Sequence, residues 1–410
     1  MATLTQLIKR AKHRPIRRLW VKRRLFDGTY ESDWQRIDRY KNSDRVLSFG
    51  AATIGIDFEP GEIGNFEISD NTILLSNFDG FFNIETDYQS FFYPDSTYLN
   101  RKFSKIKIET GYLDETDSEI GVVSTFEGVI DKVTLAEDQT ASVTILSYVS
   151  IINRYPISDL SLTGSKTVSQ IITAIMNQAK ITGFIPYVAP TPGQNVTIAD
   201  ASLLEGSYWE IITQLAYESN SVVLLVGNVW SFKPRTANVG TVWDFNGIGT
   251  SSPDLFSILS YDDEGADKVR LFWKAEGSSL SSFSSNTVLK RKYFSDPQII
   301  NLDKFNNTDK QSVLDSLLAQ WEEPRPSVEI STRFMVNEIE PLDTITIEAL
   351  GNIYPLNYIR WDLGNTWGDG SVWGGLQGGV NIFSGTEWMV TRIIKDFEGW
   401  NCQILCEKIV

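Results

Sequence analysis

Two long stretches of the chain alternate apolar and polar residues with a period of two, and a stretch with helical periodicity separates them. A period of two sends successive side chains to opposite faces of a strand, so each stretch predicts a sheet with one buried face. Several short strands divided by turn residues favour a barrel or a sandwich. The sequence therefore predicts a β-rich α+β protein with two β domains.

The first β domain is expected over residues 46–155. Residues 72–77 lead into Asp79-Gly80, a strong hairpin dipeptide, and the strand pattern resumes at residues 81–84. Further strands are expected at residues 105–109, 125–130 and 142–146.

Residues 156–235 are expected to form a small α/β insert. Apolar residues recur at the spacing of one helix face over residues 168–179. A second helix is predicted to begin at Ser207, since Glu210 three residues later completes a capping box. Residues 222–232 then form two apolar runs around a Gly-Asn turn, which predicts a hairpin.

Residues 236–410 are expected to form the second β domain. Its first strand is predicted at residues 268–273, and a helix at residues 308–323 interrupts the strands before Pro324. The remaining strands are expected at residues 328–336, 343–349, 388–395 and 401–407.

The two β domains end in similar hairpins. Residues 126–133 followed by 142–146 close the first, and residues 388–395 followed by 402–405 close the second. The match is one of pattern and not of identity. It favours an internal duplication, although similar hairpins also recur by chance in β proteins.

The first 45 residues differ from the rest of the chain in charge. Residues 1–24 hold nine Lys and Arg and no acid, whereas the whole chain has a net charge of -15. A basic arm can bind nucleic acid or an acidic protein surface. Apolar residues between the charges favour protein contact, because a free polycationic tail would not need them. The candidate contact residues are Arg17, Arg18, Lys22, Arg23 and Arg24.

A loop rich in Trp and Gly is expected at residues 360–380. Trp361, Trp367 and Trp373 stand six residues apart among glycines, a spacing that indicates a loop or irregular hairpin. The rings could contact a partner protein, since Trp is favoured at interfaces, or stack on sugars. They could equally pack on one another and on the β domain.

Catalysis, metal binding and a membrane span find little support. His13 is the only histidine and has no plausible nucleophile nearby, and no phosphate-binding loop is present. Acidic residues are abundant enough to supply a glycosidase pair, but their runs are typical of solvated loops. Cys402 and Cys406 would lie about 13 Å apart on a strand, too far for a disulfide. We expect no cofactor, no metal and no spanning segment.

The order of these elements along the chain resembles that of a known family. Phe126-x-Gly128-x-Ile130 closes the first β domain, the insert carries Tyr208-Trp209-Glu210-Ile211-Ile212, and Trp388-x-Val390 opens the last hairpin. Together they resemble the hub protein of bacteriophage tails, which is shared with contractile injection systems and gene transfer agents. The resemblance covers residues 45–410, and each short motif is weak by itself.

The resemblance implies a homotrimer with two tail-tube-like barrels in each subunit. Three subunits with two barrels each would join a sixfold tail tube to a threefold tip at the distal end of the virion tail. The implied partners are a distal tail or tail-tube ring, the tape-measure protein and tip or fibre proteins, and DNA would pass through the channel without specific binding. The basic arm lies outside the resemblance, and we expect it separately to lie along an acidic neighbour such as the adjacent subunit or the ring above. The alternative is a polysaccharide-binding or -cleaving β protein that uses the Trp loop.

Overall fold

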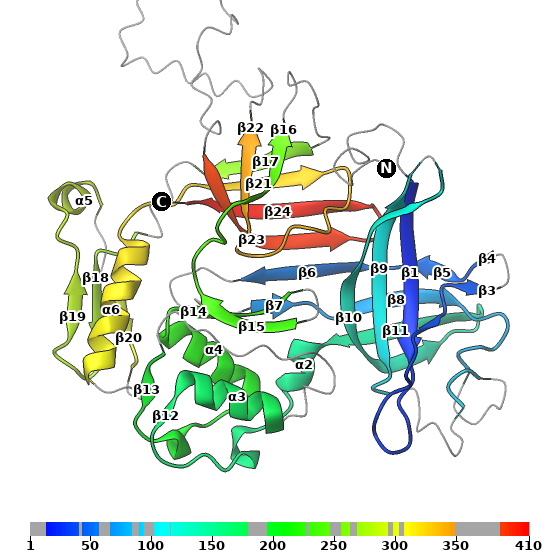
Figure 1. The fold of residues 1–410 in the computed structure, drawn as a ribbon, viewed down its shortest axis with the longest axis horizontal. Helices are drawn as coiled ribbons and strands as arrows, with labels where there is room; N and C mark the ends of the chain where they lie inside the picture. Colours follow the sequence, from blue (N-terminus) through cyan, green and yellow to red (C-terminus); the bar gives the residue numbers. More distant parts are fainter. Residues whose placement is uncertain are drawn as a thin grey trace, which may run out of the picture.

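The computed structural model describes residues 14–40, 43–56, 66–83, 90–93, 102–114, 116–178, 195–226, 229–246, 256–262, 269–293, 298–302, 307–348 and 386–409. Strands dominate these residues, and the few helices gather in two small regions (Figure 1). The fold is therefore β-rich α+β, as the sequence predicts.

The first sheet has seven strands in the order β2-β1-β9-β10-β11-β8-β5, and neighbouring strands are antiparallel. It curls strongly, so that β1 and β9 stand almost across β8 and β11 (Figure 1). Its strands are β1 Arg14–Lys22, β2 Gln35–Arg36, β5 Val46–Ser48, β8 Asn71–Ser76, β9 Lys105–Leu113, β10 Glu119–Leu135 and β11 Thr140–Ser147.

The second sheet has eight strands, six of them in the order β16-β22-β23-β24-β21-β17. The other two, β6 and β7, come from the first half of the chain, and β6 pairs with β23. Its strands are β6 Ala51–Ile56, β7 Phe66–Ile68, β16 Thr241–Asn246, β17 Phe256–Asp262, β21 Ser327–Thr332, β22 Thr344–Glu348, β23 Glu387–Asp396 and β24 Asn401–Lys408.

The same strand order occurs in both sheets. Numbered along the chain, β1, β5, β8, β9, β10 and β11 are arranged 1-4-5-6-3-2, and so are β16, β17, β21, β22, β23 and β24. The first strand differs in direction, because β1 runs antiparallel to β9 whereas β16 runs parallel to β22. The other five strands repeat in order and direction, which supports the duplication that the two hairpins suggested.

The repeat extends to single hydrogen bonds. Ile130 exchanges two backbone hydrogen bonds with residues 103–104, at 2.7 and 2.9 Å, and Val390 exchanges two with residues 342–343, at 2.8 and 2.9 Å. The first residue of each pair has a positive φ, 62° and 74°, which is uncommon without glycine. A bulge follows both Ile130 and Val390. Such a match in detail makes Ile130 the structural counterpart of Val390.

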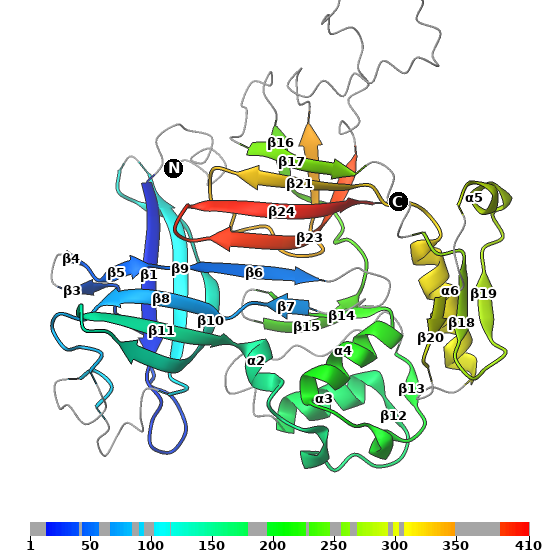
Figure 2. The same ribbon diagram turned by 180° about the vertical axis from the view of Figure 1, so that it is seen from behind.

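Two smaller regions flank the sheets (Figure 2). The α/β insert has a Ser207–Glu210 capping box at the start of α4, as predicted, and the β14–β15 hairpin pairs as expected. Its elements are α2 Tyr148–Ile152, the 3-10 turns Ile157–Asp159 and Ala201–Leu203, β12 Lys166–Thr167, α3 Val168–Gln178, β13 Thr197–Ile198, α4 Tyr208–Glu218, β14 Ser221–Val226 and β15 Val229–Pro234.

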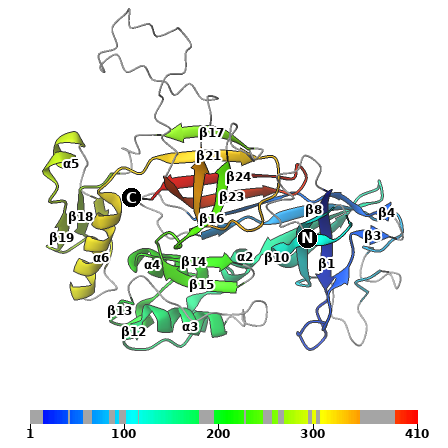
Figure 3. The ribbon, with the colours of Figure 1, turned by 45° about the horizontal axis from the view of Figure 1, so that its top comes forward.

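A three-stranded sheet with the order β19-β18-β20 lies at the far end from the first sheet, and α6 packs on it (Figure 3). The predicted helix over residues 308–323 is α6. The elements of this region are β18 Phe272–Ala275, β19 Ser281–Phe283, α5 Thr287–Lys292, β20 Gln298–Ile300 and α6 Asn307–Trp321, and two further short strands, β3 Arg39–Tyr40 and β4 Ser43–Asp44, pair near the first sheet.

Three sequence predictions require correction. Residues 81–83 form turns and not a strand, because the chain folds back through Asn77 and Gly80 after β8. The strand predicted at residues 268–273 is β18, and it belongs to the separate three-stranded sheet.

The third correction concerns domain boundaries. Residues 14–22 do not form an arm outside the first β domain, since β1 pairs along its whole length with β9. Similarly, β6 lies within residues 46–155 in the sequence but belongs to the second sheet. Both errors have one cause: strand pairing over long sequence separations leaves no local pattern.

Candidate functional site

The contact between the two sheets is the candidate site, because it joins the two repeated units. Here β6 runs antiparallel to β23 and pairs from Ala51 opposite Asp396 to Gly55 opposite Arg392. The first half of the chain thus contributes a strand to the second sheet.

A buried polar network reinforces this contact. Tyr112 of β9 donates its hydroxyl to the Met335 carbonyl at 2.8 Å and accepts from the Met335 N–H at 2.9 Å and from Trp400 Nε1 at 3.1 Å. Burial raises the pKa of Tyr112, so the hydroxyl keeps its proton. Beside it, Thr110 Oγ1 donates to Asn337 Oδ1 at 2.8 Å. These bonds fix the relative position of the two sheets.

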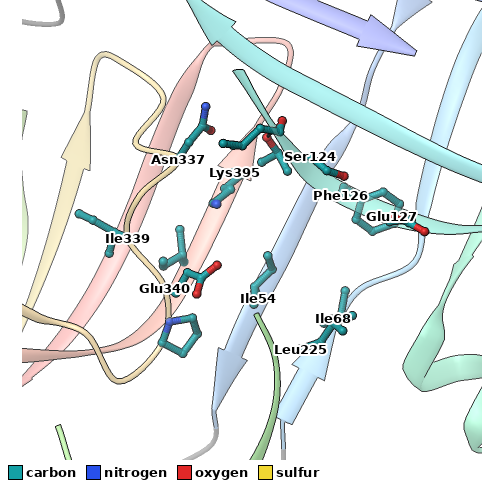
Figure 4. A pocket seen from close by; sticks show the side chains of 14 residues that line it. Ile54, Ile68, Ser124, Phe126, Glu127, Leu225, Asn337, Ile339, Glu340 and Lys395 are labelled. Carbon is teal, nitrogen blue, oxygen red and sulfur yellow. Dashed lines mark hydrogen bonds between the residues drawn. The ribbon is translucent and has the colours of Figure 1, made fainter. Parts of the chain in front are cut away.

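A cavity of about 160 Å³ lies beside β6, where β10 crosses toward β23 (Figure 4). Most of its wall is apolar, but charged and hydroxyl side chains also face it. The lining residues are Ile54, Ile68, Val123, Ser124, Thr125, Phe126, Glu127, Leu225, Asn337, Ile339, Glu340, Pro341, Ile393 and Lys395.

Lys395 is the most unusual residue of this cavity. The residue is only 4% exposed, and its side chain lines the cavity. Burial lowers the pKa of Lys395, although Cys402 and Glu340 act in the opposite direction. Figure 4 shows Lys395 and Glu340 extending toward one another across the cavity.

The other polar groups of the cavity do not assemble into a recognisable catalytic site. The buried Ser124 Oγ has no hydrogen-bond partner and is not bonded to Lys395, so the two do not form a base-activated serine. Glu127 accepts from the Tyr148 hydroxyl at 2.7 Å, and burial raises the pKa of Glu127. Among the described residues, no three His, Cys, Asp or Glu side chains gather closely enough to hold a metal ion.

The predicted basic contact residues lie on and after β1. Arg17 Nη1 donates to the Phe397 carbonyl at 2.8 Å, which ties β1 to the turn of the β23–β24 hairpin. Arg18 forms an ion pair with Glu119, and this hydrogen bond lowers the pKa of that carboxyl. Lys22 is half-buried at the end of β1.

Two further basic residues contact the first sheet's own loops. Arg23 forms an ion pair with Glu31 at 2.8 Å and stacks over the Phe91 ring at 4.6 Å, and Arg24 lies 5.9 Å from the Phe103 ring. These residues therefore have internal partners in the described structure. Their contact with a neighbouring protein stays a prediction.

Trp361, Trp367 and Trp373 lie outside the described residues, and so does His13. Cys402 and Cys406 are both buried and free, which confirms that they are not bridged. None of the described helices has the length and apolarity that crossing a membrane requires.

Sequence reasoning missed Tyr112, Lys395 and β6. Lys395 sits at the end of an alternating strand, where a lysine normally reaches solvent, so only the position of β6 reveals its burial. Tyr112 carried one available signal, since a tyrosine inside a buried strand usually has a hydrogen-bond partner.

Solved structures with a similar fold include tail proteins. The chain aligns with the tail protein from Neisseria meningitidis MC58 over 95% of its own length and 96% of the other chain, with a TM-score of 0.50 and 11% identity. This chain has the fold of a tail protein. No family model matches the sequence, and no curated protein matches it.

Two more solved structures align over nearly the whole chain. One is prophage tail protein gp18 from Listeria monocytogenes EGD-e, with 14% identity, 95% and 94% coverage and a TM-score of 0.47. The other is the 43 kDa tail protein of prophage MuSo2 from Shewanella oneidensis, with 10% identity, 95% and 98% coverage and a TM-score of 0.49.

Proposed function

We propose that this chain is a structural, non-enzymatic hub at the distal end of a phage or phage-like tail, where a homotrimer joins a sixfold tail tube to a threefold tip. The observation that carries the proposal is the repeated strand order of the two sheets. A sixfold tube ends in six equivalent surfaces, and three chains with two like sheets each match that number. In a ring of this kind, each unit contacts the next through two different faces. The ring closes when the rotation from one unit to the next is a whole fraction of a full turn.

The fold likeness supports a place in a tail. The Neisseria protein is described as a tail protein, and the two chains align over nearly their full lengths. The proposed neighbours are a distal tail or tail-tube ring, a tape-measure protein, and tip or fibre proteins. Trp361, Trp367 and Trp373 are proposed to contact such partners.

The charge of the chain suits a passage for DNA. A net charge of -15 per subunit, placed in part on the channel wall, would repel phosphates and let DNA slide without specific binding. A channel wall dominated by Lys and Arg would contradict this part of the proposal.

Light scattering tests the assembly directly. We expect a particle of about 139 kDa, three times the 46.3 kDa of one chain, and rings with threefold symmetry in electron micrographs. A monomer at all concentrations would contradict the hub. A monomer that retains or cleaves glycans would favour the polysaccharide-binding alternative instead.

A further inference from the structure

The two repeated hairpins differ in what covers their outer edge. In the second sheet, residues 392–396 of β23 pair with β24 on one side and with β6 on the other. Because Ile130 corresponds to Val390 and a bulge follows each, residues 132–136 of the first sheet correspond to residues 392–396. This segment pairs with β11, but in the described part of the chain no strand covers its other side.

The backbone groups that face this open edge can be identified. Phe397 N donates to the Gly50 carbonyl at 3.2 Å on the β6 side, so the alternation of an antiparallel ladder turns residues 393 and 395 to the same side. Their counterparts are Val133 and Leu135. Ala136 N donates to the Thr140 carbonyl at 3.0 Å, which places the even-numbered residues on the β11 side and agrees with this assignment.

We propose that the open edge of β10 at Val133 and Leu135 pairs with a strand from a second copy of this chain. The intramolecular contact is the template, because the connection after β5 supplies β6 to the second sheet. The connection after β17 holds the same topological position, and its strands β18, β19 and β20 form a separate sheet in which β19 and β20 are the outer strands. In a closed ring, the second sheet of one copy adjoins the first sheet of the next. The strand therefore comes from the second β region of the neighbour.

The surface around the edge is compatible with this pairing. Lys132 and Thr134 are exposed, and Leu135 is 36% exposed, so an added strand would cover an apolar side chain. The adjacent Asp131 forms ion pairs with Lys102 and Arg154, at 3.8 and 3.7 Å. Main-chain hydrogen bonds supply the affinity when a strand adds to a sheet edge. This inference rests on the ring of the proposed function.

Hydrogen exchange of the intact wild-type chain tests the edge without any substitution. We expect the Val133 and Leu135 amides to exchange at least about tenfold more slowly in the assembled protein than in dilute monomer, because pairing protects an edge amide. The Thr134 amide, which faces β11, serves as the internal control and should be slow in both. Fast exchange of Val133 and Leu135 in the assembly would overturn the inference.

A proline variant gives the second test. Leu135→Pro removes the N–H that faces the open edge and leaves the β10–β11 hydrogen bonds in place, which an edge position tolerates. Leu135→Ala shortens the same side chain but keeps the N–H, so it is the matched control. We expect the proline variant to assemble at least about tenfold more weakly than the alanine variant, since a buried carbonyl of the neighbour loses its partner.

The outcomes separate this inference from the hub itself. Trimers of equal strength in both variants would overturn the edge pairing and leave the hub standing. A wild-type chain that never assembles would overturn both. If Leu135→Pro fails to fold, the exchange rates of the wild-type amides decide.

Discussion

Lys395 is a buried ionisable residue whose replacement should stabilise the protein. Burial outweighs the attraction of Glu340, because the pKa of Lys395 is lowered overall. We expect Lys395→Met to raise the free energy of unfolding at pH 7 by about 1–3 kcal/mol, in the range observed when apolar side chains replace buried charges. Thermal or denaturant unfolding measures the change. Lys274→Met, at an exposed position of β18, is the matched control and should be nearly neutral.

The same residue predicts a dependence on pH. A lowered pKa means that the folded chain binds fewer protons than the unfolded chain, so this contribution makes stability rise with pH. The rise continues until the ordinary lysine value of about 10.4 is passed. The advantage of Lys395→Met should therefore shrink between neutral pH and that value. A variant less stable than wild type at pH 7 would contradict the prediction.

At the scale of elements, the cap of α4 gives a measurable local contribution. Ser207 Oγ accepts from the Glu210 N–H at 3.2 Å, and Glu210 Oε2 accepts from the Ser207 N–H at 2.6 Å. Ser207→Ala should lower the free energy of unfolding by about 1 kcal/mol. Ser207→Asp retains an acceptor and should lose much less. Equal losses in both variants would show that the Ser207 hydroxyl acts through its bond to Asn153 instead.

Elements defined by neighbouring residues could be predicted from the sequence, and elements defined by distant partners could not. The capping box and the spacing of apolar residues gave α4 and α6 within a residue or two. The position of β6 depends on β23, more than 300 residues away, and nothing within residues 51–56 records that partner. The cavity and the burial of Lys395 could not be predicted for the same reason, because both depend on the position of β6. The duplication could be predicted in part, because the sequence shows the two similar hairpins but does not show the strand order that the two sheets share.

In the whole molecule, β6 joins the two sheets into one structural unit, because this strand comes from the first half of the chain and pairs with β23 of the second sheet. Each sheet alone would lose a structural element: the second would lose β6, and the first would lose the partner of Tyr112. The two copies in a duplicated protein could instead fold as independent domains joined by a linker. Here the pairing of β6 with β23 and the hydrogen bonds of Tyr112 fix the angle between the two sheets, as the proposed ring of alternating units requires.

This coupling predicts that the two sheets unfold together. We expect a single calorimetric transition for both sheets, with the van't Hoff enthalpy equal to the calorimetric enthalpy, as a cooperative unit requires. Tyr112→Phe should lower the free energy of unfolding by about 2–4 kcal/mol, because it leaves the buried Met335 and Trp400 groups without their partner. Tyr93→Phe, at an exposed tyrosine of the first half, is the control and should change little. Two separate transitions in the wild-type protein would show that β6 and the Tyr112 bonds join the sheets too weakly to set their angle.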